Sequence, residues 1–173
     1  MLISMIAAMT EDYIIGSEDG FIPWDLPRDK EHFRSYTAGK WMLIGRKTYE
    51  EMGGWFTTQI PIVVTRQAGY SPTPSHRIAH SVTDAITMAR KSGATELVVS
   101  GGAGIFTAAL PHANRLVITR IDGTVPAEKP TYFPKFESSG RWRQQYRERW
   151  PGDSENALPI TFEIWNKQVL AGL

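Results

Sequence analysis

The 173-residue sequence contains no cysteine. Disulfide bridges, thiolate nucleophiles and cysteine-ligated metals are therefore excluded, and the composition fits a reducing compartment. An excess of charge of one sign is also lacking, because 19 lysine and arginine residues are balanced by 18 aspartate and glutamate residues. Without a global electric field to attract nucleic acid or an anionic membrane, we expect neither as a partner.

Long apolar runs are missing as well. The apolar segment at residues 1–10 is much shorter than the ~20 residues of a membrane helix, and it lacks the basic start of a signal peptide. It predicts a buried strand instead. Internal repeats, low-complexity tracts and linkers are also absent, so we expect one domain over residues 1–173. We further expect this domain to be located in the cytoplasm.

Short apolar runs alternate with helical stretches along the chain. Strands are predicted at residues 2–8, 13–16, 41–44, 60–65, 78–79, 97–99, 115–120, 142–150 and 160–169. Helices are predicted at residues 27–38, 49–52, 83–91 and 103–110, and loops at residues 68–75 and 122–130. This order predicts an α/β fold with a mostly parallel central sheet, flanking helices and a C-terminal antiparallel hairpin.

The stretch Ile22–Phe33 is the part around which we expect the site to be organised. Pro27 suits the first turn of a helix, and Asp29 follows in that same turn. With about 3.6 residues per turn, Asp29 shares a face with Leu26 and Phe33, so its carboxylate is partly removed from water. Desolvation raises the pKa of such a carboxyl group, whereas the helix N-terminus lowers it. This segment alone is equally compatible with an aspartate that only stabilises the helix end.

Three strand-to-helix junctions carry residues suited to binding anions. Gly45–Thr48 offers a glycine, two cations and a hydroxyl group, and Arg66 follows the next strand. Gly101–Gly104 is a glycine-rich turn, although Phe106 stands where a G-x-G-x-x-G motif has its third glycine. Each junction alone also fits an ordinary turn. Together, opposite Asp29, they predict a phosphorylated cofactor across the carboxyl ends of the strands.

The histidines are less informative. His76, His80 and His112 show no metal-ligand spacing, so no metal site is predicted. His32 precedes Phe33 and fits either the wall of a pocket or the surface of the helix.

Several motifs occur together in the order and spacing of one enzyme family. They are Ile6-Ala7-Ala8, Ile15-Gly16, Pro23–Pro27 followed by Asp29 and Phe33, Gly45–Glu50, Gly101–Ile105, Thr119 and Thr131–Pro134. Through them the chain resembles the bacterial-type dihydrofolate reductases over nearly its whole length. The resemblance implies a monomer that uses NADPH to reduce 7,8-dihydrofolate to 5,6,7,8-tetrahydrofolate, by hydride transfer to pterin C6 and protonation at N5.

The resemblance also implies the site residues. As catalytic residues, Asp29 would bind the N3 and 2-amino edge of the pterin, Thr119 would assist there, and Trp24 would hold an ordered water. The residues expected to bind substrate are Ile6, Ala7, Lys30, Phe33, Gln59 and Ser100. Those expected to bind NADPH are Ala8, Ile15, Gly16, Ile22, Gly45, Arg46, Lys47, Thr48, Thr65, Arg66, Gly101, Gly102, Ala103, Gly104, Ile105 and Phe106. Residues 16–24 would form a mobile loop, and the Gly101–Gly102 peptide bond would be cis.

Three positions depart from the family pattern. Gln59 stands where most members have an arginine that binds the α-carboxylate of the folate tail, and a neutral amide cannot form that charge-assisted pair. Lys30 and Arg34 on the adjoining helix are candidate substitutes. In addition, Phe106 replaces a tyrosine and Ser100 replaces an apolar residue.

Two alternative functions stay open at this point. One is the related pyrimidine reductase of riboflavin synthesis, which the glutamine at position 59 slightly favours, although Pro23-Trp24 together with Asp29 is typical of the folate enzymes. The other is a nucleotide-binding relative without catalysis, which would bind NADPH but not oxidise it.

Overall fold

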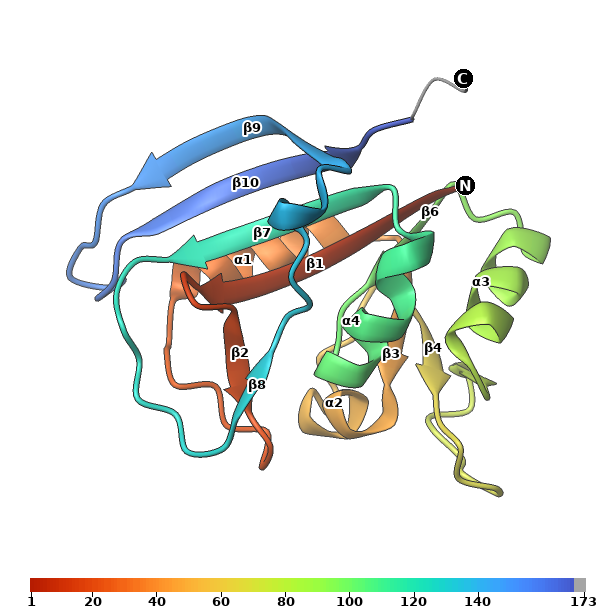
Figure 1. Cartoon of the computed structure of the whole chain (residues 1–173). Coiled ribbons are helices and arrows are strands. Elements are labelled where there is room, and N and C mark those ends of the chain that lie inside the picture. Colours follow the sequence, from red (N-terminus) through yellow and green to blue (C-terminus); the bar gives the residue numbers. More distant parts are fainter. Residues whose placement is uncertain (170–173) are drawn as a thin grey trace.

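Strands and helices alternate along the chain (Figure 1). The computed structural model describes residues 1–169. The strands are β1 (Leu2–Thr10), β2 (Ile14–Ser17), β3 (Trp41–Gly45), β4 (Ile60–Val64), β5 (Arg77–Ala79), β6 (Glu96–Val99), β7 (Arg115–Ile121), β8 (Pro130–Tyr132), β9 (Trp142–Trp150) and β10 (Ile160–Lys167). The helices are α1 (Pro27–Thr37), α2 (Arg46–Glu51), α3 (Val82–Lys91) and α4 (Ala103–Ala109), with 3₁₀ turns η1 (Leu110–His112) and η2 (Glu137–Ser139).

The main sheet has the strand order β5-β4-β3-β6-β1-β7-β10-β9. The strands from β5 to β7 pair in parallel. Strand β10 is antiparallel to both β7 and β9, so the last two strands form the predicted hairpin at one edge. The predicted α/β fold class is confirmed.

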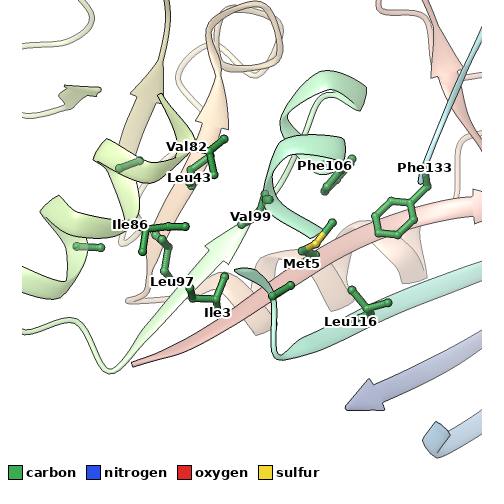
Figure 2. Close-up of a cluster of buried hydrophobic side chains, with 14 of the residues drawn as sticks. Ile3, Met5, Leu43, Val82, Ile86, Leu97, Val99, Phe106, Leu116 and Phe133 are labelled. Carbon is green, nitrogen blue, oxygen red and sulfur yellow. The ribbon is translucent and has the colours of Figure 1, made fainter. Parts of the chain in front are cut away.

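Side chains alternate between the two faces of the sheet, as strand geometry requires. On β1, Ile3 and Met5 pack in the core cluster that contains α3 and α4, whereas Ile6 packs in a second cluster with Phe33 and Tyr36 of α1. Figure 2 shows part of the first cluster. In Figure 1, α3 and α4 lie in front of the sheet and α1 lies behind it. The central strands are therefore covered on both faces, which explains their continuous apolar runs.

The structure differs from the sequence predictions in one additional strand and in element boundaries that move by one to three residues. Strand β8 was not predicted, and it pairs antiparallel with β2 in a separate two-stranded sheet. It is only three residues long and begins with Pro130, a residue typical of loops. Helix α2 begins at Arg46, before the predicted start at residue 49, because Gly45 is its N-cap. Strand β10 ends at Lys167, and Val169 beyond it is 95% exposed.

The parallel strands end at one common edge of the sheet. Gly45 ends β3, Gly101 follows β6, and Thr65 follows β4. The fold thus brings the three predicted anion-binding junctions together, which their positions far apart in the sequence do not guarantee. Among residues 1–169, the structure contains no helix with the length and apolar character needed to cross a lipid bilayer.

Candidate active site

A cleft of about 1780 Å³ lies at this edge of the sheet. It is lined by most of the residues predicted to form the site, namely Ile6, Ala7, Ala8, Ile15, Gly16, Ile22, Trp24, Asp29, Lys30, Phe33, Gly45, Arg46, Lys47, Thr48, Thr65, Arg66, Ser100, Gly101, Gly102, Ala103, Gly104, Ile105 and Phe106. The other two predicted residues, Thr119 and Gln59, are not among the residues that line it. The fold therefore assembles a site from segments spread over the first two thirds of the chain.

Asp29 projects into the cleft from the first turn of α1. Burial raises the pKa of its carboxyl group above the ordinary value of 3.8. A hydrogen bond with the Thr119 side chain and the charge of Lys30 act in the opposite direction but do not cancel this rise. A carboxylate that only stabilised a helix end would have a lowered pKa, so the environment of Asp29 favours a role in the cleft.

Thr119 lies beneath Asp29 and is only 2% exposed. It is on β7, where it pairs with Ala8 of the adjacent strand β1. A buried hydroxyl needs a hydrogen-bond partner, and here Asp29 provides one. The structure thus joins the two residues, which are 90 positions apart in the sequence (119 minus 29).

Two further carboxylates line the cleft, Glu18 and Glu51. Both are exposed, and neither was predicted. Asp29 is therefore distinguished from the other acids of the cleft by its burial.

Three glycines allow the β3–α2 and β6–α4 junctions to approach each other closely. The Gly45 N–H donates to the Gly101 carbonyl at 2.8 Å, and the Gly101–Gly102 peptide bond is cis, as the family resemblance implies. A Cβ atom on Gly45 would lie 3.0 Å from Ile105 Cγ1, and one on Gly102 would lie 3.3 Å from Thr48 Oγ1. Any side chain at these positions would crowd the side chains of Ile105 and Thr48.

Cations gather on the same side of the cleft as these glycines. Lys47 and Arg66 are exposed, and Arg46 forms an ion pair with Glu50 at 2.8 Å. His80, which was not predicted for the site, also lines the cleft and has its Nδ1 atom 3.1 Å from the Thr65 carbonyl oxygen. His80 directly follows β5. The search for residues at the ends of strands that identified Arg66 after β4 could therefore also have identified His80.

Comparison with known proteins establishes the family of this chain. The family model described as dihydrofolate reductase matches residues 2–167. The chain belongs to the dihydrofolate reductase family. It is 33% identical over 168 residues to dihydrofolate reductase type 3 of Salmonella typhimurium, covering 97% of this chain and 99% of that one. It is also 32% identical over 167 residues to the dihydrofolate reductase of Bacillus subtilis, covering 96% and 95% of the two chains.

A solved structure of the dihydrofolate reductase from Enterococcus faecalis, complexed with NADP(H) and RAB-propyl, superposes with a TM-score of 0.87. It has 27% sequence identity and covers 97% of each chain. The dihydrofolate reductase family is therefore supported by sequence and by fold. Neither the pyrimidine reductase of riboflavin synthesis nor a non-catalytic relative is favoured by these matches.

The mouth of this dihydrofolate reductase cleft contains an aromatic residue that the sequence analysis missed. Trp55 follows α2, and its ring lies 5.1 Å from the Phe33 ring between centroids. The guanidinium carbon of Arg34 is 5.6 Å from the centroid of the Trp55 ring. Arg34 and Trp55 together thus form a cationic, aromatic wall next to Phe33.

Gln59 has a different environment from the one expected. It is 7% exposed, and its side-chain oxygen accepts hydrogen bonds from the backbone N–H groups of Thr57 and Thr58, at 3.0 and 3.2 Å. Its amide nitrogen donates to Thr37 Oγ1 at 3.2 Å. These contacts engage both ends of the side-chain amide within the protein, and Gln59 does not line the cleft.

Ser100 and Phe106, the two other departures from the family pattern, both line the cleft. The Ser100 N–H donates to the Leu43 carbonyl at 3.0 Å. Phe106 is 3% exposed, and its ring packs on Phe133 with 4.9 Å between centroids. Both residues therefore combine a cleft position with packing into the core.

Replacing Asp29 by asparagine is expected to stabilise the protein at neutral pH. Burial raises the pKa of Asp29 in the folded protein above the ordinary value of 3.8. The contribution of this group to the free energy of unfolding is therefore fully present below the pKa of the unfolded state, and it is lost as the pH rises through the pKa of the folded state. The neutral asparagine avoids this loss. Thermal unfolding should show a gain of a few degrees in Tm at about pH 7, shrinking towards about pH 4.

Asp25→Asn serves as the control, because the Asp25 side chain is 78% exposed and pairs with Lys30 at the surface. This variant should show no pH-dependent gain. An Asp29→Asn protein that is no more stable than the wild type at neutral pH would contradict the burial penalty.

Proposed function

We propose that this chain reduces 7,8-dihydrofolate to 5,6,7,8-tetrahydrofolate with NADPH, and that Asp29 is the ionisable group that acts on the pterin. The observation that carries the proposal is the partly buried Asp29 carboxylate in a cleft whose other end is lined by glycines and cations. The expectations of a monomer and of a cytoplasmic location stay predictions.

The residues at the cationic end of the cleft fit NADPH. Gly45 and Gly102 line this end of the cleft, and the cations Lys47 and Arg66 suit the phosphates of a dinucleotide. When bound, NADPH supplies the hydride for the reaction. The chain's own contribution there is to bind and orient the cofactor.

Asp29 and its neighbours provide the substrate end of the cleft. Ile6, Ala7 and Phe33 offer an apolar surface for a flat ring, and Asp29 offers the one partly buried carboxylate among the described residues that line the cleft. An ionised carboxylate favours the N3 and 2-amino edge of a pterin, because both positions carry hydrogen-bond donors.

Protonation at N5 does not require Asp29 to deliver the proton. By holding and polarising the pterin in a site with little water, the carboxylate raises the basicity of N5, and a water molecule then supplies the proton. Burial raises the pKa of Asp29 above its ordinary value, a perturbation that is typical of groups in functional clefts. Trp24, which lines the same part of the cleft, is the residue that we propose orders this water.

The direct test is the Asp29→Asn variant assayed for NADPH oxidation with dihydrofolate. Loss of the carboxylate is expected to reduce hydride transfer about a hundredfold or more at neutral pH, because this group acts on the reacting ring. The Kd for NADPH should stay unchanged. Activity within a few-fold of the wild type would contradict the role of Asp29, and a wild-type protein that binds NADPH without oxidising it would contradict the proposed reaction.

Arg66 is expected to select NADPH over NADH, because a cation favours the additional charge of the 2′-phosphate. Arg66→Gln should weaken NADPH binding by about tenfold, in line with a charge-assisted hydrogen bond, and should leave NADH binding nearly unchanged. Titration of both cofactors by fluorescence would measure this. Arg90→Gln, an exposed change in the last turn of α3, is the control. Equal weakening of both cofactors by Arg66→Gln would show that Arg66 does not contact the 2′-phosphate.

Arg34 is the cation that we propose binds the carboxylate of the folate tail. Gln59 is occupied by internal hydrogen bonds, and Lys30 is paired with Asp25 at 2.7 Å, whereas Arg34 lines the cleft beside Trp55. The proposed contact lies away from the reacting carbon, so it should affect ground-state binding and transition-state binding alike.

Arg34→Ala should therefore raise KM for dihydrofolate by about ten- to a hundredfold, the range expected for a charge-assisted pair, with kcat little changed. A dihydropterin without the glutamate tail should be reduced equally well by both proteins. Gln59→Arg is the informative comparison, because a new cation there would replace a side chain that accepts two backbone N–H groups. A lower KM in Gln59→Arg, with no change in Arg34→Ala, would place the tail at position 59 instead.

A further inference from the structure

Helix α1, which carries Asp29, lacks a cap from its own N-terminal residue. The N-cap is Leu26, in an extended conformation with φ −126° and ψ 94°, and its side chain forms no capping hydrogen bond. The first N–H groups of a helix have no partner within the helix, so a distant group must bind them if they are buried. At this helix, the distant group comes from the loop at residues 151–159, between β9 and β10.

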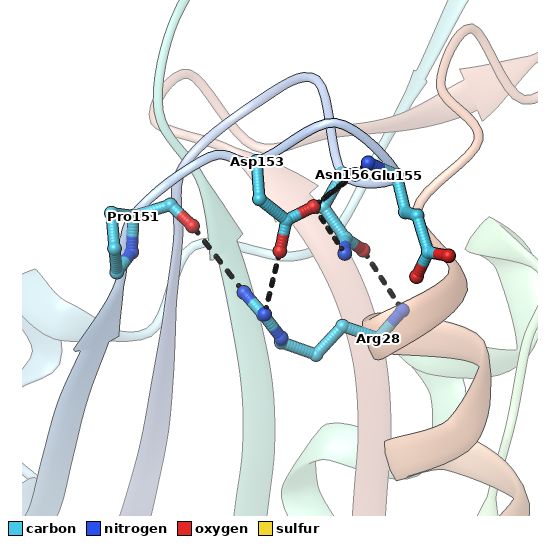
Figure 3. A network of polar contacts seen from close by, with 5 residues as sticks. All are labelled: Arg28, Pro151, Asp153, Glu155 and Asn156. Carbon is cyan, nitrogen blue, oxygen red and sulfur yellow. Dashed lines mark hydrogen bonds and ion pairs between the residues drawn. The ribbon is translucent and has the colours of Figure 1, made fainter.

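Asn156 in this loop provides the cap (Figure 3). The Arg28 N–H donates to Asn156 Oδ1 at 3.0 Å, across a sequence separation of 128 residues. Asn156 is only 4% exposed. The capping amide thus lies in a buried position, next to the residue that precedes Asp29.

Asp153 fixes the capping side chain in place. Its Oδ1 atom accepts hydrogen bonds from the backbone N–H and the side-chain amide of Asn156, at 2.7 and 3.0 Å. The backbone N–H of Glu155 adds a third bond at 2.9 Å. The hydrogen bonds with Asn156 and Glu155 lower the pKa of Asp153 to about 2, so this carboxylate is ionised at every pH at which the enzyme would work.

Arg28 closes the network from the helix side. Its guanidinium group pairs with Asp153 Oδ2 at 2.8 Å and donates to the Pro151 carbonyl at 3.3 Å. The guanidinium carbon also lies 4.4 Å from the centroid of the Trp150 ring. Arg28 is therefore bound to the loop through both its backbone and its side chain.

We propose that Asn156, with Arg28 and Asp153, is a set of positioning residues that fixes the start of α1 and thereby the location of the Asp29 carboxylate. The inference rests on the proposed function of Asp29. Asp29 directly follows Arg28, so movement of the helix start displaces the carboxylate relative to Thr119. Small displacements of a group that acts on a reacting ring reduce the rate strongly.

The readout that separates positioning from stability is the pH dependence of hydride transfer. Loosening the helix start exposes Asp29 to water, which should move its pKa down towards the ordinary value. The other groups acting on Asp29 are Lys30 on α1 and Thr119 on β7, and both are retained in the variants below. Loss of global stability alone would lower Tm without moving this midpoint.

Asn156→Ala is the main variant, measured by single-turnover NADPH oxidation with dihydrofolate across pH. We expect hydride transfer at neutral pH to fall by about three- to tenfold, a modest loss because the carboxylate is displaced but still present. The midpoint of the pH profile should shift to lower pH by several tenths of a unit or more, and the Kd for NADPH should be unchanged. Arg28→Met removes the ion pair with Asp153, the hydrogen bond to the Pro151 carbonyl and the contact with Trp150, but it keeps the backbone N–H bond to Asn156. It is therefore the milder variant if Asn156→Ala does not fold, and a smaller shift in the same direction is expected.

Asn114→Ala is the matched control. Asn114 Oδ1 accepts the N–H of Ile3 at 3.0 Å, the same type of contact as that of Asn156, but near the start of β1 and outside the cleft lining. It should lower Tm without moving the pH midpoint. If Asn156→Ala, or Arg28→Met in its place, also leaves the midpoint and the rate unchanged, the network is only structural and the inference is wrong. Failure of the proposed function is distinguishable, because the wild-type protein would then not oxidise NADPH with dihydrofolate.

Discussion

Burial of the Asp29 carboxylate is the physical constraint on which the rest of the site depends. An ionised carboxylate is costly to remove from water, and here burial outweighs the opposing effects of Thr119 and Lys30 on its pKa. The free energy gained by packing the core on both faces of the sheet offsets the cost of burying this carboxylate. Ile6 and Phe33, which help to exclude water from the carboxylate, belong to one of the core clusters themselves. The surroundings of Asp29 and the core are therefore built in part from the same side chains.

The opposite end of the cleft depends on backbone proximity. Gly45 and Gly101 bring two strand-to-helix junctions within hydrogen-bond distance, and both glycines line the open space of the cleft. Cations surround this space without filling it. The cleft thus combines an apolar end with one buried charge and a polar end with several exposed charges of opposite sign, which suits a flat ring at one end and phosphates at the other.

The sequence was sufficient to predict the fold class and most of the residues that line the cleft. The elements could be predicted from local signals, such as the apolar run at residues 97–99 and the proline at position 27. The cleft residues could be predicted because parallel sheets place binding residues at the carboxyl ends of their strands. Strand β8 was missed because a three-residue strand that begins with Pro130 has no periodic pattern of its own. Its pairing with β2 depends on contacts between distant segments.

The features of the site that could not be predicted share this dependence on distant contacts. The Gln59 side chain points where its hydrogen bonds to Thr37 and to the neighbouring backbone hold it, and these bonds depend on packing. The family pattern at position 59 therefore did not reveal the orientation of this side chain. Trp55 follows Gly53-Gly54, where the sequence suggests only a turn, and it lies at the cleft through contacts with Phe33 and Arg34 on α1. The Asn156 cap likewise has no signal near α1 in the sequence, because it comes from a loop 128 residues away.

The separation between Arg28 and Asn156 has a consequence for the synthesis of the protein on the ribosome. Strand β1 and helix α1 are translated well before the amide that caps α1, because Asn156 follows Arg28 by 128 residues. The loop that holds this amide joins β9 to β10, and β10 docks on the main sheet by pairing with β7. The nascent chain therefore cannot complete the environment of Asp29 until the β9–β10 hairpin has left the ribosome and has paired with β7, long after the carboxylate itself has been made.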